Sequence, residues 1–178
     1  KIDSYYASGD MMKASSTLKK LKPSVVSKLG PNNTYMPGIN LREARINLGL
    51  GMLSEFDRTL GAALNEAIIT FGENSNSYAN TLIEVAAMYN EYGNFRIARD
   101  YISKAEQILS KTADIEEPVR ARLALIKAEA MIGQGFCREA IALLSEFDKY
   151  FLSRAVDKES VVEDGAIKVR RVPEGEIF

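Results

Sequence analysis

The side chains that could do chemistry are few and scattered. Histidine is absent from the 178 residues, which removes Ser-His-Asp and Cys-His nucleophilic catalysis. It also removes the commonest protein ligand of zinc, copper and haem. The single cysteine, Cys137, excludes an internal disulfide and a CxxC site. A partner base for this thiol is missing, so we interpret Cys137 as a small packed side chain.

Two acidic pairs are the remaining candidates for acid–base chemistry, Glu116-Glu117 and Glu163-Asp164. Adjacent residues on a helix point about 100° apart, so neither pair converges on one substrate. No glycine-rich phosphate loop and no calcium-loop pattern is present in the sequence. The sequence therefore predicts a protein that is not an enzyme and that has no cofactor or metal site.

The charge composition argues against two classes of partner. Lys and Arg total 23 and Asp and Glu total 24, so there is no overall basic field to hold nucleic acid. A local lysine stretch (Lys19, Lys20, Lys22 and Lys28) has no interleaved aromatic residues, and we interpret it as a solvated helix face. No apolar run approaches the roughly 20 residues that span a bilayer. We expect no membrane insertion, and a cytoplasmic location is favoured over a periplasmic or secreted one.

The elements that must position any site are helices arranged in pairs. Between residues 77 and 92, apolar side chains recur at helical spacing: Leu82, Val85, Ala86 and Tyr89. Gly93 ends this helix, and Asn94 is placed to cap the next one with its side-chain oxygen. Two helices joined by about two residues run antiparallel as a hairpin.

Further hairpins are expected on the same grounds. Their helices span residues 2–8 and 11–21, 40–54 and 57–71, and 114–133 and 136–151. Capping boxes of Asn40 with Glu43 and of Asp114 with Glu117 open two of them. The first helix is short, which makes about three and a half hairpins. The stretch from Pro23 to Gly38 is predicted to be a loop or broken helix, and no alternating apolar pattern predicts a sheet.

The turns of these hairpins repeat. In three copies a glycine precedes a small alanine by five residues, at Gly9, Gly93 and Gly135. The step from Ala98 to Ala140 sets a long period, and the repeat before it is expected to be shorter. In the 40–71 pair, Phe56 stands where a turn glycine is expected. The small residues let two helices cross closely.

This pattern resembles the tetratricopeptide repeat. The central copy carries the resemblance through the following residues: Leu82, Val85, Ala86, Tyr89, Gly93, Asn94, Phe95, Ala98, Ile102 and Ala105. The long period resembles the 42-residue variant of kinesin light chains. The resemblance implies an all-α solenoid, a right-handed superhelix of about 3.5 repeats over residues 1–152, followed by an extension, linker or further repeat over 153–178. An ordinary helical bundle and a different helical-pair repeat are the alternatives.

The resemblance also implies a concave groove that binds a peptide or a partner helix. We expect the following residues to line it: Ile46, Leu50, Leu53, Asn80, Ile83, Asn90, Arg122 and Glu129. They suit an apolar or amphipathic segment, because the Lys and Asn cluster that clamps a C-terminal carboxylate is lacking. The alternative for the apolar members is burial by a neighbouring repeat or by a C-terminal helix that lies in the groove.

These observations predict a non-catalytic scaffold for protein–protein interaction. Two other interpretations stay open at this point. The chain could be the regulatory or substrate-positioning arm of a larger multidomain enzyme, such as a bacterial protease or signalling protein. Its repeats could also stack between copies to form a homo-oligomer.

Overall fold

The computed structural model describes the backbone of residues 1–111, 115–163 and 166–169, and the side chains of these residues up to 149. This part of the chain forms eight helices and two short strands. The helices are α1 (Ile2–Ala7), α2 (Met11–Leu29), α3 (Met36–Gly49), α4 (Leu53–Phe71), α5 (Asn76–Glu91), α6 (Phe95–Leu109), α7 (Glu117–Gly133) and α8 (Cys137–Glu159). The strands are β1 (Ser160–Glu163) and β2 (Ala166–Val169). The predicted helical class is confirmed.

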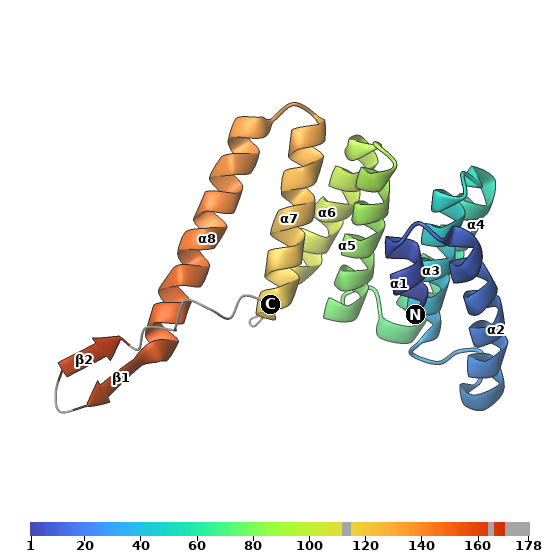
Figure 1. Ribbon diagram of the computed structural model, residues 1–178, viewed down its shortest axis with the longest axis horizontal. Helices are drawn as coiled ribbons and strands as arrows, with labels where there is room; N and C mark the ends of the chain where they lie inside the picture. Colours follow the sequence, from blue (N-terminus) through green and yellow to red (C-terminus); the bar gives the residue numbers. More distant parts are fainter. Residues whose placement is uncertain (112–114, 164–165, 170–178) are drawn as a thin grey trace.

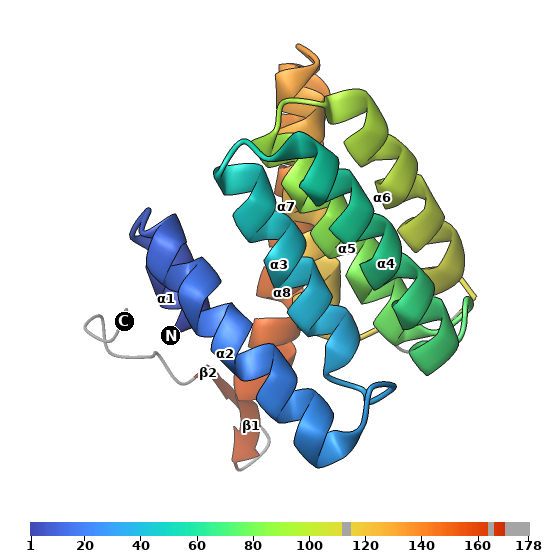
Figure 2. The ribbon, with the colours of Figure 1, turned by 90° about the vertical axis from the view of Figure 1, so that its right-hand side faces the viewer.

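Consecutive helices pair and the pairs lie side by side. Each odd-numbered helix packs against the even-numbered helix that follows it, and α2, α4 and α6 also contact the first helix of the next pair. The first helices α3, α5 and α7 contact one another in turn. Figure 1 shows the resulting row, from α1 and α2 at one end to α8 at the other. Figure 2 looks along this row from the end that holds α2.

The turn inside each pair contains a glycine with positive φ. These glycines are Gly9, Gly51, Gly93 and Gly135, with φ between 72° and 87°. Their positions are evenly spaced along the chain, so the expectation of a shorter period before the last repeat is wrong. The turn of the second pair is at Gly51 and not at Phe56, which lies inside α4. A left-handed turn conformation favours glycine, because a Cβ there is strained.

The end of α2 and the start of α3 also differ from the sequence prediction, which treated the prolines and glycines between residues 23 and 38 as signals of a loop or broken helix. Helix α2 continues through Pro23 to Leu29, where Val25 and Val26 pack on the cluster around Ile2. Helix α3 begins at Met36, with Pro37 in its first turn, where a missing N–H costs no hydrogen bond.

The expected capping box at Asn40 is also wrong. Asn40 lies one turn inside α3 and is buried, and its side-chain amide donates to the Glu66 carboxylate. The other expected capping box includes Asp114, which lies outside the described residues; α7 begins at Glu117 with Pro118 in its first turn.

The C-terminal part of the chain departs from the predicted pattern in two ways. Helix α8 continues to Glu159 and so crosses the expected boundary at residue 152. It is followed by an antiparallel pairing of β1 with β2, in which Val161 faces Lys168 and Val162 faces Ile167. The signal for this hairpin is an Asp-Gly dipeptide at 164–165 between runs of β-branched residues.

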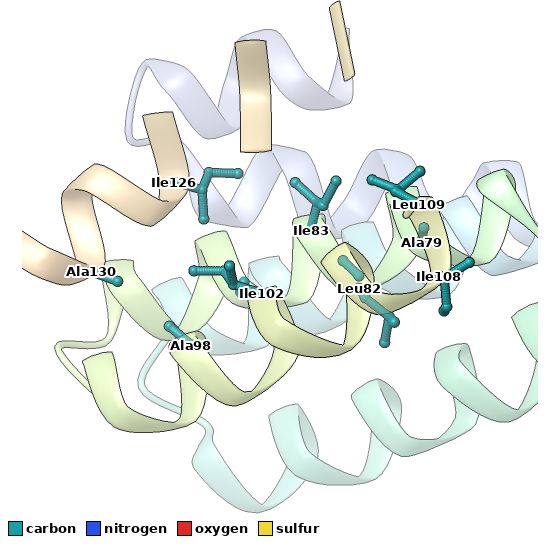
Figure 3. Packing of buried hydrophobic residues seen from close by; sticks show 11 residues of the cluster. Ala79, Leu82, Ile83, Ala98, Ile102, Ile108, Leu109, Ile126 and Ala130 are labelled. Carbon is teal, nitrogen blue, oxygen red and sulfur yellow. The ribbon is translucent and has the colours of Figure 1, made fainter. Parts of the chain in front are cut away.

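Among the described residues, the buried apolar side chains form three clusters along the row. The cluster nearest α8 joins α5, α6 and α7, and Figure 3 labels nine of its residues: Ala79, Leu82, Ile83, Ala98, Ile102, Ile108, Leu109, Ile126 and Ala130. The alanines at positions 79, 98 and 105 are fully buried, which brings the helix axes close together.

An aromatic trio fills the space between α4, α5 and α6. The Tyr89 ring on α5 meets the Phe56 ring of α4 edge-on, with the ring centres 5.7 Å apart. It also stacks on the Tyr101 ring of α6, with the ring centres 5.6 Å apart. Such pairs add to the free energy gained from burial. This trio links the second and third helix pairs.

Two of the junctions between helix pairs contain an ion pair, and the two ion pairs are at matching positions of the helices. Lys22 Nζ of α2 lies 2.6 Å from Glu43 Oε2 of α3. Two helix pairs later, Glu106 Oε1 of α6 lies 2.6 Å from Lys127 Nζ of α7. The signs are therefore reversed. At the middle junction the same two positions hold Leu64 and Val85, which belong to one apolar cluster. The three junctions thus differ in chemistry at a shared site.

Candidate partner-binding site

The residues predicted to line one groove fall into four groups, and the first group consists of two core residues. Ile46 is 2% exposed and belongs to the apolar cluster that contains Ile2 and Leu18. Ile83 is fully buried between α5, α6 and α7. Both are therefore removed from the candidate surface. They are buried because neighbouring helix pairs cover that face of α3 and α5.

Leu50 and Leu53 form the second group, in which Leu50 lies beside Ile46. Leu50 follows α3 and lines a cavity between α2, α3 and α4. Leu53 begins α4 and is 41% exposed. The structure does not bring these two side chains together with Asn80 and Arg122.

Asn80 and Arg122 belong to a polar surface formed by the first helices of the pairs. A cavity of about 300 Å³ lies between α3 and α5. Its lining consists of Thr34, Tyr35, Pro37, Gly38, Leu41, Arg42, Phe71, Ser77, Asn80, Thr81 and Glu84. Arg122 of α7 reaches this lining, because its Nη1 lies 3.1 Å from Oε1 of Glu84. Among the described residues, Asn80 has no hydrogen-bond partner for its side-chain amide.

Charges of alternating sign cross this surface from helix to helix. Asp3 on α1 accepts two hydrogen bonds from Arg42 on α3, at 2.9 and 3.1 Å, and Arg122 on α7 pairs with Glu84 on α5. The guanidinium of Arg42 holds the pKa of Asp3 below its ordinary value, and the same contact raises the pKa of Arg42. The surface is therefore paired and neutral, and it offers hydrogen bonds rather than a net charge.

A second polar contact group ties α1, α3 and α5 together. Glu91 accepts a hydrogen bond from the Tyr6 hydroxyl at 2.8 Å and one from Arg45 Nη2 at 2.9 Å. The Arg45 guanidinium also lies 5.5 Å from the centre of the Tyr6 ring. Burial and the nearby Glu91 carboxylate raise the pKa of Tyr6 to about 12.

Asn90 and Glu129 have a structural role at the junction of α5 and α7. The Asn90 amide donates to the backbone oxygen of Ile126 at 2.8 Å and to Glu129 at 3.3 Å. Its side-chain oxygen is buried without a partner among the described residues. The side-chain N–H groups of Asn90 are thus already used inside the molecule. Of the two predicted asparagines, Asn80 is the one whose side-chain amide is available to a ligand.

Cys137 is exposed at the start of α8, so the expectation of a packed side chain is wrong. The matching residues of earlier pairs, Met11 and Phe95, lie against Gly49 and Gly133 at the end of the next first helix. Cys137 lies on the last helix pair of the row, where the described residues place no such neighbour.

Arg42 and Glu84 are the functional candidates that sequence reasoning missed. The sequence contains a signal that could have identified them. Arg42 and Glu84 are separated by as many residues as the turn glycines Gly51 and Gly93, so they take matching positions on α3 and α5. Recognising it required the correct spacing of the turn glycines.

Comparison with known proteins adds no family. No family model and no curated protein matches this chain. Within the described residues, no group of three or more acidic, cysteine or histidine side chains is placed to hold a metal ion. The same residues include no helix long and apolar enough to cross a membrane.

Proposed function

We propose that this chain is a tetratricopeptide-like repeat solenoid that serves as a non-catalytic scaffold for protein–protein interaction. The proposal is supported by the even spacing of the four turn glycines and by the packing of each helix pair on the next. Such a pair cannot bury its apolar face alone and relies on its neighbours. Function in repeat proteins is argued from the exposed residues of the row and not from the fold.

The proposed ligand is an extended, apolar or amphipathic segment of another protein that lies across α3, α5 and α7. The observation that carries this assignment is the cavity between α3 and α5, with the unpartnered Asn80 amide inside it. Tyr35 is 64% exposed and offers an apolar contact beside Arg42. Asn80 would bond the peptide backbone and fix its register, because an amide both donates and accepts.

Selection of a random-peptide display library on the full chain tests this proposal. Peptides enriched on the wild-type chain are synthesised and their binding is measured for Asn80→Ala and for the matched control Asn65→Ala, which alters an asparagine on α4, away from this cavity. We expect Asn80→Ala to weaken binding about 5- to 30-fold, as loss of one or two hydrogen bonds does. Equal binding by the two variants would place the peptide elsewhere and refute the proposed site.

A further inference from the structure

A second and larger cavity lies between α2, α3 and α4. Its volume is about 510 Å³. It is lined by Met12, Ser15, Leu18, Lys19, Lys22, Pro23, Glu43, Ile46, Asn47, Leu50, Met52 and Glu55. We call it the α2–α4 groove. Leu18 and Ile46 are buried side chains of its lining, whereas Met12 is 72% and Met52 47% exposed. The groove therefore combines apolar buried residues with two accessible methionines.

The same positions are filled elsewhere in the row. One helix pair later, Tyr89 takes the place of Asn47, and its ring packs against those of Phe56 and Tyr101. Two pairs later, Met131 replaces Asn47, Phe136 replaces Met52, and the matching cavity is only about 100 Å³. The short Asn47 side chain, which donates weakly to Thr59 Oγ1 at 3.4 Å, leaves the α2–α4 groove open.

The rim of this groove along α2 carries two lysines, Lys19 and Lys22. Helix α2 contains five lysines and no acidic residue. Lys13 is paired with Asp10, and Lys22 with Glu43. The other three, Lys19, Lys20 and Lys28, are exposed and make no ion pair with any described residue, and of these three Lys19 lines the groove. On the α4 rim, Glu55 is already paired with Arg58, so the free charge beside the groove is positive.

We propose that the α2–α4 groove binds an amphipathic helix of a partner protein, with acidic residues along the flank that faces α2. The apolar face of that helix would contact Leu18, Leu50 and the two exposed methionines. Methionine side chains are unbranched and adapt to different partners, as in other grooves that accept helices. This surface uses different residues from the cavity between α3 and α5, so the inference goes beyond the proposed function.

Three labelled peptides of about five helical turns test this proposal on the full chain. The first has Leu and Ile at positions i, i+3, i+4 and i+7 with glutamate on both flanks. The second replaces the glutamates with lysine, and the third scrambles the order of the first. Fluorescence anisotropy measures the affinity of each. We expect the acidic amphipathic peptide to bind at least about tenfold more tightly than the other two at low salt.

Two variants place the binding in the groove. Asn47→Met fills the cavity as Met131 does in the later pair, and Lys19→Glu reverses the charge of the rim. Each is expected to weaken binding of the acidic peptide about five- to tenfold, with an unchanged circular dichroism spectrum. Asn80→Ala is expected to leave this binding unchanged, which separates the groove from the site of the proposed function.

Several results would overturn the proposal. These are equal binding of the scrambled peptide, equal binding of the lysine peptide, and undiminished binding by both variants. Failure of all three peptides to bind also counts against it. Association with vesicles that contain anionic lipid, in the absence of peptide binding, would assign the basic rim to a membrane surface instead.

Discussion

Three helical glycines differ in the space that surrounds them, and this difference predicts opposite effects of one substitution. A Cβ on Gly133 would lie 2.3 to 2.4 Å from three atoms of the Phe95 ring. A Cβ on Gly49 would lie 2.9 Å from the Met11 sulfur, and one on Gly61 would meet nothing within 4 Å. The series therefore runs from open space, through a flexible neighbour, to a rigid ring.

The expected changes in the free energy of unfolding follow from two opposing terms. Replacing glycine by alanine inside a helix stabilises it by up to about 1 kcal/mol, so Gly61→Ala is expected to raise stability by about 0.5 to 1 kcal/mol. Overpacking costs about 1 to 3 kcal/mol, and Gly133→Ala is expected to lose about 1 to 2 kcal/mol net. Gly49→Ala is expected to fall between them, because the methionine side chain can move aside.

Urea unfolding followed by circular dichroism measures all three variants. The double variant Gly133→Ala with Phe95→Leu provides the control, because Leu53 occupies the position matching Phe95 in the second pair and shows that leucine is accepted there. The smaller side chain should recover at least half of the loss. If Gly133→Ala is as stabilising as Gly61→Ala, the packing of Phe95 on α7 is not as tight as described, and the reasoning fails.

Three further predictions concern the turns and the tyrosines. Gly93→Ala places a Cβ at φ 79° and is expected to cost about 1 to 2 kcal/mol, whereas Gly93→Asn should cost less, as urea midpoints would show. Tyr89→Ala removes the centre of the aromatic trio and should cost about 2 to 4 kcal/mol in the same assay; a loss below about 1 kcal/mol would contradict the packing. Burial raises the pKa of Tyr6 and Tyr89 to about 12, so their contribution to stability is present below pH 10 and is lost as pH rises towards 12. Urea midpoints against pH, with tyrosinate absorbance, check this, and a flat profile would count against it.

The helix pairs were predictable where local signals were complete. In the third pair the apolar spacing, the turn at Gly93 and the cap at Asn94 all agree with the structure, in which Asn94 accepts a hydrogen bond from the backbone N–H of Ile97. In the second pair the turn was misplaced, because Phe56 occupies a position that holds alanine in the other three pairs. One large side chain at a position of small residues hid the constant spacing.

The candidate site was less predictable than the fold. Periodicity identifies the apolar side of a helix, but it does not tell which neighbouring helix covers each part of that side. Ile83 is buried because α7 packs on α5, whereas Leu125, the matching residue of α7, is 55% exposed. The partners of Arg42 and Asn90 lie far away along the chain, in contacts that no local pattern contains.

The reversed ion pairs between helix pairs have a consequence for how the chain avoids errors during folding. If the first two helices docked on α7 in place of α3, Lys22 would face Lys127; if α6 docked on α3, Glu106 would face Glu43. Like charges would meet in both wrong assemblies, whereas the apolar middle junction would leave either charge without a partner. Near-identical repeats are prone to exchange and misassembly. In this chain, one position at each junction distinguishes the correct neighbour from the incorrect ones.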